Sequence, residues 1–205
     1  MKNQDTTALH KASYGLYLLS AKNNEQDNAC IINTFLQITS NEPVCCIISV
    51  NKQNLTYEMI AKTRKFNLSV LTVETPFELV KRFGYRSGKN TNKLQDFSDF
   101  SKSENGLAYL KNFANAFLSF EVFEMVDCDT HTLFVSILTE CKTLNDKETI
   151  TYDYYQKNVK PKPQLVNAKG YRCNICGYIY KGEPLPPEII CPICKHGALD
   201  FTKLS

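Results

Sequence analysis

The chain contains no tryptophan and, among its 205 residues, only three methionines, three histidines and eight glycines. The glycines are scattered and form neither a G-x-G-x-x-G fingerprint nor a P-loop, which sets a Rossmann-type dehydrogenase aside. The longest apolar run, residues 44–50, is far too short to span a bilayer. The polar amino terminus MKNQDTTALHK lacks the apolar stretch of a signal peptide. These absences predict a cytoplasmic protein with no membrane partner.

A strong charge of either sign is missing as well. The formal net charge is +3 and the sequence pI is about 8.3, and no stripe of lysine or arginine occurs. This balance argues against a nucleic-acid partner. With 43% hydrophobic residues, the chain is long enough for one sizeable core and a small additional module.

Cysteine, by contrast, is abundant, and four of the nine cysteines form two C-x-x-C pairs: Cys173, Cys176, Cys191 and Cys194. Two such knuckles supply a tetrahedral S₄ site, which selects zinc or iron. The odd count and the missing secretion signal argue against a disulfide scaffold. The other five are predicted to be reduced core thiols: Cys30, Cys45, Cys46, Cys128 and Cys141.

Composition divides the chain into two units. Residues 158–169 carry two prolines, three lysines and little apolar content, which predicts a linker between a body at 1–157 and a tail at 170–205. The tail, about 36 residues long, buries too little apolar surface to fold unaided, so the metal must supply much of its folding free energy.

The body is dominated by strand patterns rich in β-branched and aromatic residues, at 14–21, 30–39, 44–51, 66–73, 118–122 and 131–138. Short helices are expected at 57–63, with Thr56 as the cap, and at 76–83. The polar stretch 87–105 is expected to be a loop. Many strands and few helices predict a mainly β fold built on a closed or nearly closed β-barrel.

The tail resembles rubredoxin in the shortened form found in rubrerythrin-type proteins. The resemblance is carried by Tyr171, Cys173, Cys176, Gly177, Tyr178, Tyr180, Cys191, Pro192, Cys194 and Phe201. It implies one iron ion on four thiolates, covered by aromatic side chains. Lys195 departs from the pattern, which has glycine there, and a structural zinc ribbon is the alternative.

The body resembles the flavin reductase family with the FMN-binding split barrel, close to its ferric reductase-like branch. The resemblance rests on SYGLYLLSAK, NTFLQITS, SVNKQNLTYE, SVLTVETP, RFGYRSG and THTLF, which occur in family order. Together, the two units resemble the high-molecular-weight rubredoxins, a family of flavoprotein–rubredoxin fusions. Ala29, Cys30 and Asp129 depart from the family pattern, which has glycine, glutamine and glycine at those positions.

The resemblance implies an FMN site with three groups of contacts. A polar cluster before the first helix suits the phosphate: Ser49, Asn51, Lys52, Asn54 and Thr56. Amide and hydroxyl groups suited to the edge of the flavin ring belong to Asn33, Thr34 and Gln37. Additional positive charge for the phosphate and cover for the flavin ring are expected from Arg82, Phe83, Ser87 and Lys89. His131 is expected near the flavin and the nicotinamide, where it would position them without acting as an acid or base. The alternatives are an ordinary polar turn, a solvated strand face and a structural histidine.

These units imply an oxidoreductase that oxidises NAD(P)H at FMN and passes single electrons through the iron to an acceptor protein. The resemblance implies a homodimer and points to a flavodiiron oxygen or nitric-oxide reductase as the acceptor. One alternative is a flavin or ferric reductase with a zinc-filled tail. Another is a non-enzymatic binding module with a zinc ribbon that contacts nucleic acid.

Overall fold

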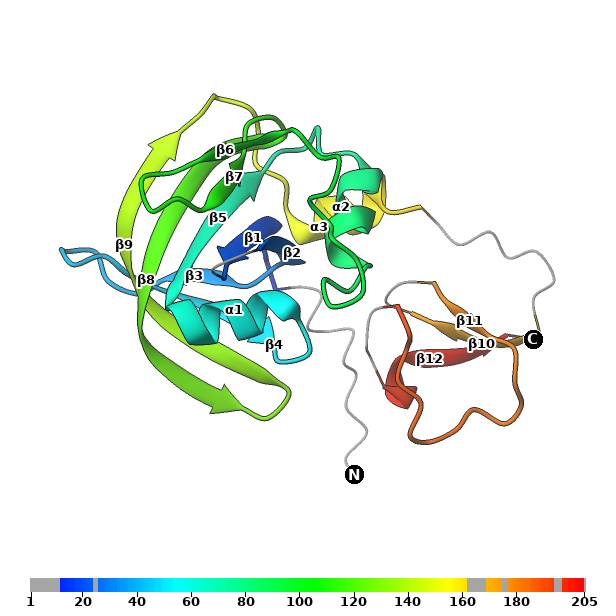
Figure 1. The fold of residues 1–205 in the computed structure, drawn as a ribbon. Helices are drawn as coiled ribbons and strands as arrows, with labels where there is room; N and C mark the ends of the chain where they lie inside the picture. The colour runs from blue at the N-terminus through cyan, green and yellow to red at the C-terminus, as the bar shows by residue number, and fades with distance from the viewer. Residues whose placement is uncertain (1–11, 24–25, 162–168, 175–176, 194–196, 205) are drawn as a thin grey trace.

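The structure is a computed structural model that describes residues 12–23, 26–161, 169–174, 177–193 and 197–204 (Figure 1). The body contains the strands β1 Tyr17–Lys22, β2 Asp27–Ile32, β3 Phe35–Gln37, β4 Cys45–Asn51, β5 Lys65–Leu71, β6 Phe100–Lys102, β7 Ala108–Leu110, β8 Ala114–Cys128 and β9 His131–Thr143. Its helices are α1 Leu55–Thr63, α2 Phe77–Gly84, α3 Tyr152–Tyr154 and a π-helical turn Tyr155–Val159. The tail contains β10 Gly170–Cys173, β11 Ile179–Tyr180, a 3₁₀ turn Ala198–Asp200 and β12 Phe201–Leu204.

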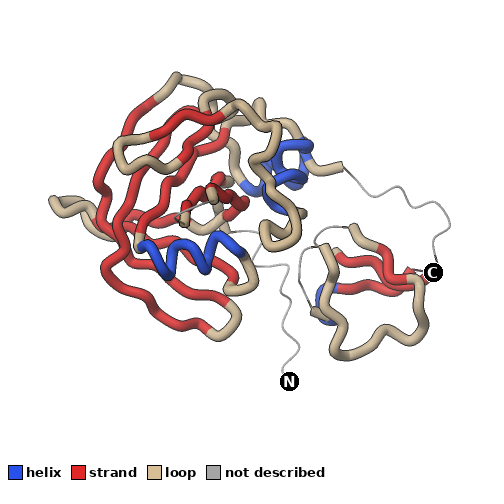
Figure 2. Tube along the Cα trace, viewed as in Figure 1, coloured by secondary structure: helices blue, strands red, loops and turns tan. Residues whose placement is uncertain are grey.

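The body is built on one seven-stranded sheet in the order β2-β1-β5-β8-β9-β4-β3. Its two edge strands, β2 and β3, follow each other along the chain and are joined only by Asn33 and Thr34. The sheet therefore curls into an open barrel that is split between β2 and β3, and strands dominate the body in Figure 2. This confirms the predicted mainly β fold with few helices.

Alternation along the strands sets the barrel core. On β4, Cys46, Ile48 and Val50 are buried, and they stand opposite the buried Ser136, Phe134 and Thr132 of β9. Phe66 and Phe120 stack with ring centroids 4.8 Å apart in the same core. Helix α1 lies over β1 and β2, and α2 packs against β2.

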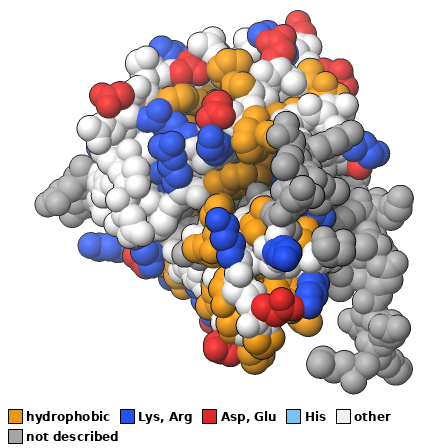
Figure 3. Space-filling view, turned by 90° about the vertical axis from the view of Figure 1, so that its right-hand side faces the viewer, with side chains coloured by type: hydrophobic (Ala, Val, Ile, Leu, Met, Phe, Trp, Pro, Cys, Tyr) orange, Lys and Arg blue, Asp and Glu red, His pale blue; other side chains and the backbone are white. Residues whose placement is uncertain are grey.

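The tail forms its own sheet in the order β11-β10-β12. Within the part of the chain that the structure describes, no helix is long and apolar enough to cross a bilayer. On the face shown in Figure 3, lysine and arginine side chains alternate with acidic and hydrophobic ones and form no continuous basic stripe.

Several element predictions were wrong in detail. The strand expected at 30–39 is interrupted, because Asn33 and Thr34 connect two strands that lie at opposite edges of the sheet. Thr56 does not cap α1: the N-cap residue is Asn54, and Thr56 lies fully buried inside the first turn. Part of the expected loop at 87–105 forms β6. Cys128 and Cys141 are exposed, not core thiols: Cys128 lies where the β8–β9 hairpin extends beyond the core, and Cys141 lies in the exposed carboxyl-terminal part of β9.

The stacked pair in the core generates a stability prediction. Replacing Phe66 with alanine removes a fully buried ring and leaves a cavity, so we expect the free energy of unfolding to fall by about 3–5 kcal/mol. Tyr154→Ala removes a ring that is 38% exposed and is the control, with a much smaller expected loss. Denaturant unfolding followed by circular dichroism measures both; equal losses would contradict the assignment of Phe66 to the core.

Candidate flavin site and metal centre

The carboxyl end of β4 gathers most of the polar residues predicted to bind a flavin. Asn51 stands opposite His131 in the β4–β9 ladder, and the Lys52 amide donates to the carbonyl oxygen of Thr130 at 3.0 Å. The Asn54 amide donates to the carbonyl oxygen of Asn51 at 3.0 Å. The β4–β9 pairing and the turn between Asn51 and Asn54 therefore place the start of α1 beside the β8–β9 hairpin.

Asn33 and Thr34 belong to the same neighbourhood. Phe35 pairs with Ile48, so the two residues before it stand beside the Ser49 end of β4. The Thr34 hydroxyl donates to Asn33 Oδ1 at 3.2 Å. Gln37 does not join them: it pairs with Cys46 and its side-chain amide donates to the carbonyl oxygen of Thr39 at 2.8 Å.

Lys52, predicted to meet the phosphate, is held in an ion pair. Its ammonium lies 2.5 Å from Asp127 Oδ2 on the β8–β9 hairpin. Hydrogen bonds from Lys52 and from the Asp129 amide lower the pKa of Asp127, and the bond to Asp127 raises the pKa of Lys52. The charge of Lys52 is thus already compensated by a carboxylate that the sequence patterns did not single out.

A buried polar network holds the first turn of α1 against β2. Asn28 Nδ2 donates to Thr56 Oγ1 at 2.8 Å, and Asn54 Nδ2 lies 3.9 Å from Cys30 Sγ. Burial raises the pKa of the Cys30 thiol, an effect opposed by the charge of Lys93 and a hydrogen bond with Thr56. Asn28 Oδ1 is buried without a partner among the described residues.

The loop after α2 reaches the same helix end. Lys89 forms an ion pair with Glu58 in the first turn of α1, and Ser87 accepts a hydrogen bond from the Lys89 amide at 3.3 Å. A side chain at Gly88 would collide with Asn28, since a Cβ there would lie 2.6 Å from Asn28 Oδ1. The loop thus closes over the amide of Asn28.

Arg82 and Phe83 have other roles. The Arg82 Nε donates to the carbonyl oxygen of Lys93 at 2.7 Å, Nη2 donates to that of Gln95, and the guanidinium lies 5.0 Å from the Phe97 ring centroid. Arg82 therefore holds the loop. Phe83 is fully buried against Phe97 and Phe100, so the prediction that it covers a flavin was wrong.

These residues fit a flavin. Asn33, Thr34, Ser49, Asn51 and His131 offer hydrogen-bonding groups beside a helix start that no side chain caps. The buried oxygen of Asn28 has no partner among the described residues, so the polar network under that start can accept one further donor. Sequence reasoning missed Asn28, Lys93 and Asp127, because no spacing motif contains them.

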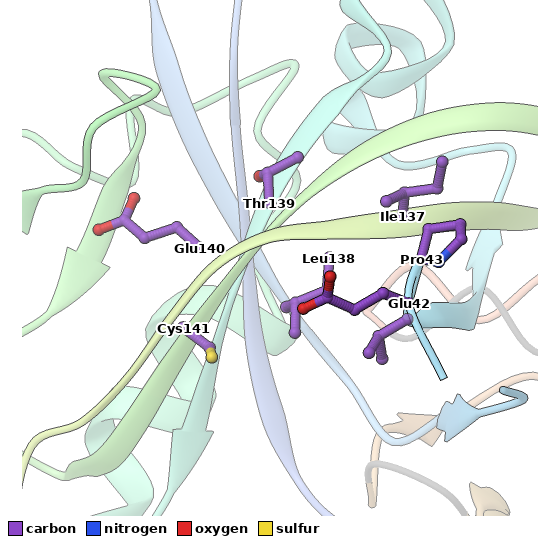
Figure 4. Close-up of a pocket in the computed structure, with 8 residues that line it drawn as sticks. Glu42, Pro43, Ile137, Leu138, Thr139, Glu140 and Cys141 are labelled. Carbon is purple, nitrogen blue, oxygen red and sulfur yellow. The ribbon is translucent and has the colours of Figure 1, made fainter. Parts of the chain in front are cut away.

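A separate groove of about 640 Å³ lies at the other end of β4 (Figure 4). Its lining residues are Glu42, Pro43, Val44, Ile137, Leu138, Thr139, Glu140 and Cys141. Cys45 pairs with Ile137 at this end of the ladder, whereas Asn51 pairs with His131 at the opposite end. None of the residues predicted to bind a flavin lines the groove.

The tail brings two of the predicted metal ligands into its interior. Cys173 and Cys191 are both fully buried, and Cys176 and Cys194 lie outside the described residues. The Gly177 amide donates to the Cys173 carbonyl oxygen at 2.9 Å with φ at +79°, which gives the tight left-handed turn of a knuckle. Phe201 stands opposite Cys173. Two buried thiols in so small a unit fit a thiolate metal site.

Gly170 generates a prediction for this unit. Its φ is +119°, and a Cβ there would lie 2.1 Å from the carbonyl oxygen of Tyr180. We expect Gly170→Ala to cost the tail at least about 1–2 kcal/mol and to lower its metal content. Gly197→Ala is the control, because a Cβ at Gly197 meets nothing within 4 Å. Metal per chain after gel filtration tests this; equal contents in the two variants would refute the role of Gly170.

Comparison with known proteins identifies both units. The family described as "Flavin reductase like domain" matches residues 9–162, and the family described as "Rubrerythrin, rubredoxin-like domain" matches residues 171–202. A ferric-chelate reductase (NAD(P)H) of Archaeoglobus fulgidus is 34% identical over 77% of this chain and 92% of its own. An FMN-binding protein from Thermus thermophilus shares the fold, with a TM-score of 0.62 and 20% identity over 70% of this chain and 78% of its own.

One relative aligns with the chain across both units. The high molecular weight rubredoxin of Moorella thermoacetica is 35% identical over 98% of this chain and 100% of its own. The matches support flavin-linked electron transfer by an oxidoreductase with a rubredoxin domain. The chain therefore belongs to the flavin reductase-like family, with a rubredoxin-like domain joined at its carboxyl end as in high molecular weight rubredoxins.

Proposed function

We propose that the protein oxidises NAD(P)H at FMN and delivers single electrons through an Fe(Cys)₄ centre to an acceptor protein. The observation that carries this proposal is the union of a flavin reductase-like and a rubredoxin-like domain in one chain. A nicotinamide gives two electrons as hydride, iron in an S₄ site accepts one, and a flavin exchanges either number.

The flavin would lie at the carboxyl end of β4. In this proposal the amides at the start of α1, with Ser49, Asn51, Lys52 and Asn54, receive the phosphate. Asn33 and Thr34 bond the polar edge of the ring, and His131 orients the flavin and the nicotinamide. The printed description of the Thermus thermophilus relative as FMN-binding supports FMN as the flavin.

The outward face of the sheet supports a homodimer. Residues directly opposite each other in the β3-β4-β9-β8 ladders share this face, and six of them form what we call the outer apolar face: Leu36, Ile47, Val126, Leu133, Val135 and Ile137. A solvated antiparallel sheet face is normally polar, so a second copy is its natural cover. Ser49, Asn51 and His131 adjoin this face on the same side. A dimer would thus enclose the flavin, and the tail would serve the flavin of its own or of the second chain.

The metal and the acceptor complete the proposal. Cys173, Cys176, Cys191 and Cys194 would bind iron, and the reduced iron would pass its electron to a flavodiiron-type oxygen or nitric-oxide reductase in the cytoplasm. Support comes from the rubredoxin-like match and the exposed, unbridged thiols of Cys128 and Cys141, which suit a reducing compartment. The ferric-chelate reductase relative favours one alternative: reduction of ferric complexes at the flavin, with zinc in the tail.

Anaerobic titration with NADH tests the circuit. We expect purified protein to show flavin and iron–thiolate absorption, and the iron band to bleach after NADH is added. Cys173→Ser should abolish the iron band while NADH still reduces the flavin, because the two sites are built from different residues.

Other outcomes separate the alternatives. If NADH reduces the flavin while the iron stays oxidised, the proposed electron transfer from flavin to iron is wrong. Zinc in the tail with unchanged ferric-complex reduction in Cys173→Ser would establish the ferric reductase instead. A colourless protein would reject both redox functions.

The outer apolar face generates its own prediction. Leu36→Asp places a charge on a side chain that is 59% exposed, so the single chain should fold while the dimer dissociates and flavin content falls. Leu199→Asp, at an exposed leucine of the tail, is the matched control. Sedimentation velocity measures the oligomeric state; a Leu36→Asp protein that remains dimeric would argue against this interface.

A further inference from the structure

Lys93 is a buried cation that no carboxylate compensates among the described residues. Its side chain is almost fully enclosed, and its ammonium donates to the carbonyl oxygens of Ala29 at 3.0 Å and Phe83 at 2.9 Å. Burial lowers the pKa of Lys93. Neutral carbonyl oxygens satisfy two of its three N–H donors, and that of Phe83, in the last turn of α2, carries only part of a negative charge. Most of the charge of Lys93 is therefore unbalanced, which is unfavourable in a protein interior.

The other lysines near the site differ from Lys93 in this respect. Lys52 is paired with Asp127, and Lys89 with Glu58. Both pairs are partly exposed, so solvent and salt weaken their fields. Of these three lysines, Lys93 is therefore the one whose field is poorly screened and has no carboxylate against it.

Lys93 lies next to the start of α1. It binds the carbonyl of Ala29, and the neighbours on either side in β2, Asn28 and Cys30, contact Thr56 and Asn54 at the first turn of that helix. The helix start has no side-chain cap, and its free amides carry a partial positive charge.

An incomplete hydrogen-bonding group marks the same place. Asn28 Oδ1 is buried and unpartnered beside Gly88, and rotating the amide would present Nδ2 there as a donor. The ammonium of Lys93, the start of α1 and the rotated amide of Asn28 together form a surrounding that suits an anion.

We propose that Lys93 supplies the buried positive charge of an anion site at the start of α1, and thereby selects a flavin that carries a phosphate over riboflavin. The inference rests on the proposed flavin binding and assigns specificity within it to a loop residue whose ammonium contacts β2 and the carboxyl end of α2. The exposed lysines then contribute less to this preference than the enclosed one.

The test compares FMN with riboflavin, which differ in the phosphate alone. In Lys93→Met the aliphatic stem is kept and the charge removed, so the preference for FMN over riboflavin should fall about ten- to a hundredfold. Riboflavin affinity should change little. Lys81→Met removes an exposed lysine of α2 that pairs with Glu78 and should leave the preference unaltered. Lys93→Arg keeps the charge and should retain most of it. Circular dichroism confirms that each variant is folded.

A second measurement needs no variant. If the enclosed ammonium carries the preference, the ratio of FMN to riboflavin affinity of the natural protein should persist in concentrated NaCl, because buried charges are little screened. A ratio that collapses with salt would assign the preference to exposed lysines and overturn the proposal. Equal losses of both flavins in Lys93→Met would show a structural role and overturn it as well.

Inorganic phosphate separates this proposal from the proposed function. If the natural protein binds no flavin but phosphate raises its melting temperature, and does not do so for Lys93→Met, the anion site stands and the flavin function fails. If FMN binds and Lys93→Met keeps the full preference, the flavin function stands and the role of Lys93 fails. Absence of both flavin and phosphate binding would overturn both.

Discussion

The antiparallel pairing of β4 with β9 is the constraint on which the body depends. Side chains alternate along both strands, so a single register decides which residues enter the core and which face outward. Ile48 and Phe134 fill the barrel, whereas Ile47 and Val135 make the opposite side apolar too. The same register ends with Asn51 opposite His131. One ladder thus fixes the core, the proposed association surface and the polar end of the candidate site.

The tail differs from the body in what it buries: thiols take the place of a large hydrophobic core. Cys173 and Cys191 are as completely buried as any leucine of the barrel. Around them the backbone has positive φ angles at Gly170 and Gly177, and one short sheet supports the unit among its described residues. In the proposed metal centre, metal–sulfur bonds take over the role of apolar packing. The two halves of the chain therefore reach their folds by different means.

Sequence patterns predicted the strands that are long and apolar, such as β4 and β5, because their residues alternate or cluster clearly. They failed where tertiary contacts decide. Asn33 and Thr34 look like part of a strand, yet they span the split of the barrel. Phe83 looks available for a ligand, yet two rings from the following loop enclose it.

Polar groups were harder to predict than apolar ones. The C-x-x-C spacing identifies the four candidate thiolate ligands, whereas the polar sequence around Lys93 does not indicate that this side chain is buried. Its environment arises only when the loop folds back on β2, 64 positions away at Ala29. Asp127 likewise meets Lys52 across 75 positions, so no local pattern links them.

The β8–β9 hairpin also limits how related chains can vary in length. Inserting one residue between Phe134 and His131 would turn the histidine from the outward to the inward side, or force the phenylalanine out of the core. Insertions of two residues preserve the facing of both and simply lengthen the hairpin. Among homologues, this segment should therefore gain or lose residues in even numbers, unless a bulge like that at Val122/Glu124 absorbs the odd one.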